Sequence, residues 1–168
     1  MKIVVLGGGI STERDVSLSS SRMIYQALKK KGHQAILLDV YLGYEGDYED
    51  IFEKDRDWAE TIGGVRESNP DISRIKAMRP DGGKSFFGPG VIPVCQMADV
   101  VFLGLHGEDG ENGKVQAAFD LLGIRYTGTD YVSSALAMDK SLAKELFAFH
   151  SIPCLLYTSD AADDLLCV

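Results

Sequence analysis

The sequence predicts an α/β fold with a parallel sheet. A strand-like run at 2–7, a helix-like segment and a second strand-like run at 33–40 follow one another at the start of the chain. Such a unit joins two parallel strands by a right-handed crossover. Strand and helix patterns alternate again from residue 98 onward. Repeated alternation of this kind is typical of α/β layer folds.

The first strand and helix have clear sequence signals. The run KIVVLG (2–7) is β-branched, apolar and closed by a glycine, as expected of a buried parallel strand. Thr12 and Asp15 have the spacing of a capping box, so we expect a helix to begin near Glu13. Its apolar residues recur at helical spacing: Val16, Met23, Ile24, Ala27 and Leu28.

The middle of the chain is less regular. Residues 41–97 are acidic and aromatic with weak periodicity, and we expect an insertion with short helices. The glycines and prolines at 79–90 predict a loop or an edge hairpin. The pattern becomes regular again at residue 100. We predict a strand at 100–105, a loop at 106–113, a helix at 114–123, a short strand at 124–128 and one or two helices at 129–153.

Charge and composition exclude several classes of protein. The chain has 168 residues and a formal net charge of −8, so nucleic acid is not an expected partner. No apolar run is long enough to span a bilayer, and the N-terminus lacks a secretory cleavage site. We therefore expect a cytoplasmic protein with no membrane partner. The three cysteines form no CxxC pair, so neither a zinc site nor a disulfide framework is expected.

The end of the chain carries a separate expectation. From Cys154 it reads CLLYTSDAADDLLCV. The first eight letters match, in order, the translated read-through of a sequencing adapter, so we interpret 154–168 as a non-native tail. The natural sequence would then end near Pro153, in a gene that continued further. A genuine short amphipathic tail is the alternative.

The first strand leads into the glycine loop GGGISTERDVSLSS (7–20). Gly7 and Gly9 fit the first half of a dinucleotide fingerprint, but Thr12 occupies the position of its third glycine. Asp39, at the end of the second strand, keeps a nicotinamide site open as an alternative. A further alternative is that the glycines only permit a tight turn.

The acids of this loop favour a cationic ligand. Glu13 would compete with a phosphate for the amides at the helix N-terminus and would attract an ammonium group instead. The alternative is that Glu13 and Asp15 only cap the helix.

A second informative loop, LHGEDGENGKVQA (105–117), follows the third predicted strand. His106 could polarise or neutralise an anionic ligand group, or it could bond to nearby loop backbone. The acids Glu108, Asp109 and Glu111 lack the spacing of a calcium loop, so we expect a solvated or capping role and no metal site.

Three stretches together resemble the N-terminal domain of the D-alanine–D-alanine ligases, a family of ATP-grasp enzymes. They are the two loops above and YTGTDYVSSALAMDK (126–140). The second loop follows the family signature His-Gly-x-x-Gly-Glu-Asp-Gly-x-x-Gln, with Asn112 in place of the signature's Asp. The resemblance implies the Rossmann-like parallel sheet of a pre-ATP-grasp domain at 1–138 and the start of a truncated ATP-grasp domain at 139–153.

The resemblance also implies an activity. The family joins two D-alanines through an acyl phosphate for peptidoglycan synthesis, with ATP and Mg²⁺ as cofactors and commonly as a homodimer. By motif position, Glu13 holds the ammonium of the first D-alanine, Val16 lines the same pocket, and His106 lies beside the substrate carboxylate or its phosphate. Lys140 approaches the nucleotide. The magnesium carboxylates, and a serine and a tyrosine that partner the family glutamate, would lie after Pro153.

Two alternatives to a D-alanine–D-alanine ligase remain. A D-alanine–D-lactate ligase shares this N-terminal domain, and a non-enzymatic α/β module could use the glycine loop for a small ligand. On the ligase interpretation, we expect the chain by itself to be catalytically inert.

Overall fold

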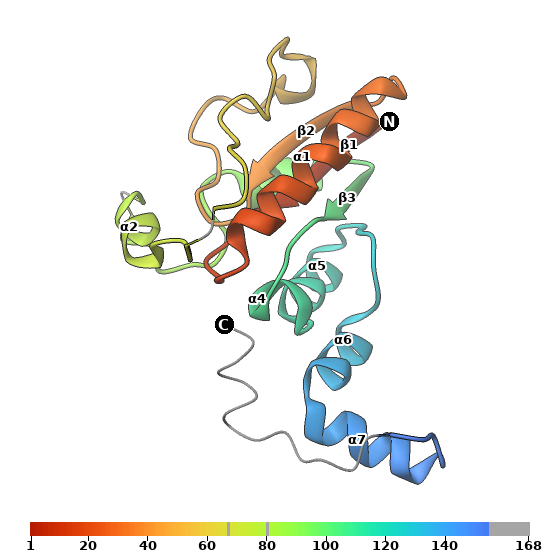
Figure 1. The fold of residues 1–168 in the computed structure, drawn as a ribbon. Coiled ribbons are helices and arrows are strands. Elements are labelled where there is room, and N and C mark those ends of the chain that lie inside the picture. Colours follow the sequence, from red (N-terminus) through yellow and green to blue (C-terminus); the bar gives the residue numbers. More distant parts are fainter. Residues whose placement is uncertain (67, 80, 155–168) are drawn as a thin grey trace.

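The computed structural model describes residues 1–66, 68–79 and 81–154, with a parallel sheet at one end and helices extending away from it (Figure 1). The sheet has the order β2-β1-β3. Its strands are β1 (Lys2–Gly7), β2 (Gln34–Asp39) and β3 (Val100–Leu103). Both neighbours pair with β1 in parallel, Lys2 opposite Gln34 and Ile3 opposite Val100. The predicted α/β fold with a parallel sheet is confirmed.

Helix α1 (Arg14–Lys30) connects β1 to β2 and packs on both strands. Two small buried residues, Ser17 and Ser21, let it approach the sheet closely. A Cβ atom on Gly7 would lie only 2.5 Å from Oγ of Ser21. Oγ of Ser17 accepts a hydrogen bond from the amide of Gly8 at 2.9 Å and donates one to the carbonyl of Gly104 at 2.7 Å. The helix therefore fixes the carboxyl ends of β1 and β3 relative to each other.

The predicted capping box is wrong, although the helix begins where expected. The N-cap is Glu13, and its side chain makes no capping hydrogen bond. Thr12 therefore lies one residue outside the cap position. Asp15 pairs instead with the guanidinium of Arg66, with 2.8 Å between Oδ2 and Nε.

The apolar strands form the core of the molecule. Ile3 to Leu6 of β1 and Ala35 to Leu38 of β2 are buried, as is Val101 of β3. On the helices, Tyr25 of α1 and Phe119 of α5 (Lys114–Leu122) are buried as well. Continuous apolar runs of this kind are what a parallel sheet covered on both faces requires.

The segment between β2 and β3 contains the predicted short helices. They are η1 (Ile51–Glu53), α2 (Ile72–Ala77) and α3 (Val91–Gln96). Among the described residues of 79–90 the structure has a loop and no hairpin strands, so the loop alternative holds there. This loop packs on the end of β2, since the amide of Gly88 donates to the carbonyl of Val40 at 2.8 Å.

The remaining elements follow β3. They are α4 (Glu108–Glu111), α5, α6 (Tyr131–Met138) and α7 (Lys140–Phe149). The predicted loop at 106–113 thus contains one helical turn. The predicted strand at 124–128 is reduced to a single parallel bridge between Tyr126 and Val101. Residues 155–168 of the tail interpreted as non-native lie outside the described residues. None of the helices in the described part has the length and hydrophobicity of a membrane span.

Candidate functional site

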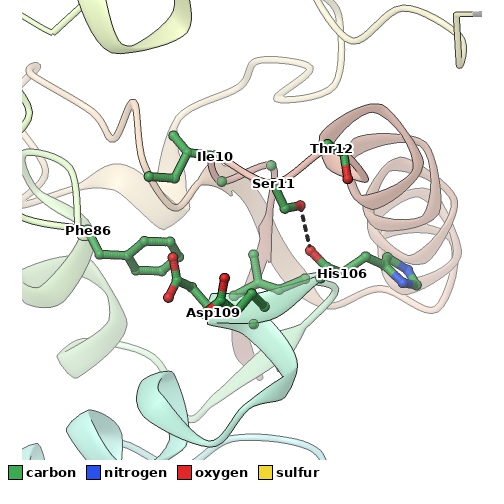
Figure 2. A pocket seen from close by; sticks show the side chains of 12 residues that line it. Ile10, Ser11, Thr12, Phe86, His106 and Asp109 are labelled. Carbon is green, nitrogen blue, oxygen red and sulfur yellow. Dashed lines mark hydrogen bonds between the residues drawn. The ribbon is translucent and has the colours of Figure 1, made fainter. Parts of the chain in front are cut away.

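The two loops singled out in the sequence meet at one cavity (Figure 2). They follow β1 and β3, which are neighbours in the sheet, so both open at the same edge. The cavity has a volume of about 430 Å³. Its lining comes from 8–12 in the first loop, 105–110 in the second, and Phe86.

An ion pair between Arg14 and Asp39 supports the glycine loop. The guanidinium of Arg14 donates to the carbonyl of Gly9 and pairs with the carboxylate of Asp39. At Gly8, φ is +79°, and a Cβ atom there would lie 2.5 Å from Oδ2 of Asp39. Only glycine meets both conditions without strain.

This arrangement disfavours the nicotinamide alternative. The carboxylate of Asp39 also accepts hydrogen bonds from the amides of Tyr41 and Leu42, at 2.9 and 3.0 Å. Its oxygens are therefore engaged within the protein, whereas a ribose hydroxyl would need one of them as an acceptor.

The two loops are joined directly. Oγ of Ser11 donates a hydrogen bond of 2.8 Å to the backbone carbonyl of His106, the dashed line in Figure 2. Next to it, Gly107 has φ +84°. A Cβ atom on Gly107 would lie 2.8 Å from Cβ of Ser11 and 3.2 Å from Oε2 of Glu13. The carboxylate of Glu13 therefore lies at the junction of the two loops.

Glu13 is exposed, and its side chain has no hydrogen-bond or ion-pair partner among the residues that the structure describes. The alternative that Glu13 and Asp15 only cap α1 is not what the structure shows, because neither side chain caps the helix. An unpaired carboxylate beside a cavity suits a cationic ligand group.

His106 lines the cavity, but its ring does not point toward the side formed by Phe86 (Figure 2). Nδ1 lies 3.6 Å from Oε1 of Glu111, and the side chain is about one-third exposed. The imidazole therefore has a carboxylate close to one of its two nitrogens.

The other acids of the second loop are balanced by a lysine. Nζ of Lys114 lies 3.1 Å from Oδ1 of Asp109 and 3.7 Å from Oε1 of Glu108. These carboxylates raise the pKa of Lys114. No group of three or more His, Cys, Asp or Glu side chains in the described ranges could hold a metal ion.

Val16 and Lys140 do not line this cavity. Val16 is 41% exposed, on the first turn of α1 beyond Glu13. Lys140 is the first residue of α7, which Figure 1 shows at the opposite end of the described chain from the sheet.

Phe86 and Gln116 were not predicted as parts of the site. Phe86 comes from the irregular segment 41–97, where no periodic signal indicated its position. Gln116 is buried, and its amide nitrogen donates to the carbonyl of Gly110 at 3.3 Å, which ties α5 to the second loop. Its place at the end of the signature was the signal that could have identified it.

Comparison with known proteins identifies relatives of this chain. The family model described as "D-ala D-ala ligase N-terminus" matches residues 2–129. The D-alanine–D-alanine ligase of Lacticaseibacillus casei is 47% identical over 154 residues, which are 90% of this chain and 43% of the relative. That of Pediococcus pentosaceus is 46% identical over 156 residues, with 90% and 44% covered. The chain thus spans less than half the length of these curated relatives.

Solved structures agree with the fold. The D-alanine–D-alanine ligase of Coxiella burnetii has a TM-score of 0.59 and 27% identity, over 98% of this chain and 48% of that one. The enzyme of Bacillus anthracis complexed with ATP has a TM-score of 0.54 over 98% of this chain and 44% of that one. At 23% identity, the latter shows the fold alone.

Proposed function

This chain belongs to the D-alanine–D-alanine ligase family, and we propose on that premise that the whole protein joins two D-alanines with the use of ATP. In the proposed reaction the carboxylate of the first D-alanine accepts a phosphoryl group from ATP. The amine of the second D-alanine then attacks the acyl carbon, and phosphate leaves. The dipeptide would serve peptidoglycan synthesis in the cytoplasm.

The observation that carries the proposal is the position of Glu13. Its unpaired carboxylate lies beside Gly107, where the two loops meet at the cavity. An ammonium group would neutralise this charge, and D-alanine is small enough for the cavity next to it. We therefore propose that Glu13 binds the ammonium of the first D-alanine. Val16, which does not line the cavity in the free chain, is proposed to border the bound substrate from the first turn of α1.

His106 is proposed to lie beside the carboxylate of the same substrate. A protonated imidazole would offset the negative charge that phosphoryl transfer brings to this group. In the free protein the carboxylate of Glu111 lies 3.6 Å from Nδ1 of this imidazole. The substrate would then lie between a carboxylate that pairs with its ammonium and an imidazolium that pairs with its own carboxylate.

ATP and Mg²⁺ would be held mainly by other residues. Lys140 is proposed to approach the nucleotide from the start of α7, within the segment 139–153 that we assign to an ATP-grasp domain. The described acids of 106–113 do not fit a Mg²⁺ site, because Lys114 already pairs with Glu108 and Asp109. A homodimer is proposed on the family resemblance alone.

Substrate binding tests the role of Glu13. We expect D-alanine to shift the amide NMR signals of 8–13 and of Gly107 in this chain, and Glu13→Gln to abolish those shifts. Glu145→Gln, an equal change of charge on the exposed face of α7, is the control and is expected to leave them intact. Equal shifts in the wild type and Glu13→Gln would contradict the proposal.

Three further measurements test the ligase itself. The DNA downstream of codon 153 is expected to encode an ATP-grasp domain, and a native stop codon there would favour a binding module instead. The chain alone is expected to release no phosphate from ATP and D-alanine above the level of a Glu13→Ala control. Dipeptide rather than depsipeptide formation by the complete protein would exclude a D-alanine–D-lactate ligase.

A further inference from the structure

A second cavity borders the Arg14–Asp39 ion pair. Its volume is about 420 Å³, and its walls come from α1, from β2 and from the segment that follows β2. Arg14 and Asp39 line this cavity, whereas Gly8 and Gly9, which they contact, line the first one. The two cavities share no lining residue, but one ion pair connects them.

The second cavity has an aromatic wall with cations stacked on it. Tyr44 and Trp58 meet edge to face, with 5.4 Å between their ring centroids. The guanidinium carbon of Arg56 lies 4.4 Å from the centroid of Trp58, and Nζ of Lys54 lies 5.4 Å from that of Tyr44. Stacking of this kind holds a cation against an apolar surface while its N–H groups stay free to donate.

The charged side chains that line the cavity have a net positive charge. Among the described residues they are two arginines and one aspartate. Arg14 and two backbone amides already engage Asp39. Arg56 has no carboxylate partner within the described ranges. The chain as a whole has a net charge of −8, so the positive charge of this cavity differs in sign from that of the whole chain.

The remaining lining is mainly apolar. It includes leucines of α1 and β2, together with Leu42, Ile62 and Met78. An apolar cavity with one or two placed polar groups is the usual form of a small-molecule site, and about 420 Å³ lies within the usual range.

We propose that this cavity binds a small organic anion with a flat apolar body. Arg56 donates to the anionic group, and Trp58 and the leucine side chains cover the body. Because Arg14 also donates to the carbonyl of Gly9, an anion that draws Arg14 from Asp39 changes the support of the glycine loop. The site does not depend on the ligase function, since D-alanine would occupy the other cavity.

The chain provides its own reporter for this site. Trp58 is its single tryptophan, so tryptophan fluorescence reports on this wall. The probe is 3-phenylpropionate, and neutral 3-phenylpropanamide is its matched control. We expect a saturable change in emission with the acid and about tenfold weaker binding of the amide, because the charged hydrogen bonds to Arg56 are lost. D-Alanine is expected not to displace the acid.

Substitutions test whether 3-phenylpropionate binds at Arg56. Arg56→Gln is expected to weaken the acid about tenfold and leave the amide unchanged, whereas Arg56→Lys retains part of the preference. The control is Arg125→Gln, an exposed arginine outside this cavity, which is expected to bind like the wild type. Equal affinity for acid and amide in the unchanged chain, or no saturable response to the acid, would overturn the proposal even if Arg56→Gln failed to fold.

Discussion

The hydroxyl of Ser11 donates a hydrogen bond of 2.8 Å to the backbone carbonyl of His106, 95 positions further along the chain. This bond joins the loop after β1 to the loop after β3. Gly107 lies against Ser11 at the same junction, and the carboxylate of Glu13 lies beside it. The position of Glu13 relative to the second loop therefore depends on this contact.

Removing the hydroxyl should loosen the junction. Ser11→Ala is expected to lower the free energy of unfolding by about 1 kcal/mol, the net worth of a partly buried hydrogen bond. Urea denaturation followed by circular dichroism measures this as a lower midpoint with an unchanged slope. Ser68→Ala, an exposed serine in a bend, is the control. Equal midpoints for the wild type and Ser11→Ala would show that the bond does not stabilise the fold.

Adding a methyl group at the junction should cost more. Gly107→Ala places a Cβ 2.8 Å from the Ser11 side chain, in a residue with φ +84°. Gly123→Ala is a matched control, since its φ is +67° but no atom lies within 4 Å of the new Cβ. Backbone strain alone costs about 1–2 kcal/mol, so we expect Gly123→Ala to lose about that much and Gly107→Ala clearly more. Equal losses would mean that the two loops are not in contact.

The sheet could be predicted from sequence because a buried parallel strand needs a continuous apolar run. KIVVLG and the run before Asp39 satisfy this, and their pairing follows from the crossover between them. The strand predicted at 124–128 does not form in full, because its sequence IRYTG is not a continuous apolar run. Arg125 is exposed, and the pairing is limited to one bridge between Tyr126 and Val101, whose hydrogen bonds run from the amide of Val101 to the carbonyl of Arg125 and from the amide of Thr127 to the carbonyl of Val101.

The site was predictable only in part. Its two loops carried glycines and acids at the ends of predicted strands, so Glu13 and His106 could be named. The interactions that shape the loops were not visible. The pairing of Arg14 with Asp39 depends on the way α1 packs across the sheet. Phe86 reaches the cavity from an insertion without periodicity, and nothing local to its sequence indicates this.

The Asp15–Arg66 pair should make stability depend on pH. The Arg66 guanidinium holds the pKa of the Asp15 carboxyl below its ordinary value. The folded protein then binds fewer protons than the unfolded one, so the pair stabilises the fold above the unfolded pKa of about 3.9. This contribution disappears as the pH falls through the folded pKa. Since the Arg66 side chain is 61% exposed, screening by solvent keeps this contribution small.

Asp15→Asn is therefore expected to be less stable than the wild type at pH 7, and this difference is expected to shrink as the pH falls below about 3.9. Urea denaturation at pH 7 and pH 2 measures the difference. The control is Asp55→Asn, which removes an exposed aspartate that has no ion-pair partner among the described residues. A difference between Asp15→Asn and the wild type that is the same at pH 7 and pH 2 would contradict this account of the pair.

Helix α7 should make the isolated chain self-associate. Leu142, Leu146 and Phe147 follow one another at helical spacing and are 43%, 41% and 40% exposed. No residue of α7 is buried in the described structure, where the helix packs against α6. Contiguous exposed apolar side chains favour association because burial removes their surface from water. We expect the sedimentation coefficient to rise with concentration and Leu146→Gln to reduce that rise. Leu121→Gln is the control, since Leu121 is 90% exposed on α5. A stable monomer at high concentration, or an equal effect of both variants, would show that this face of α7 does not mediate association.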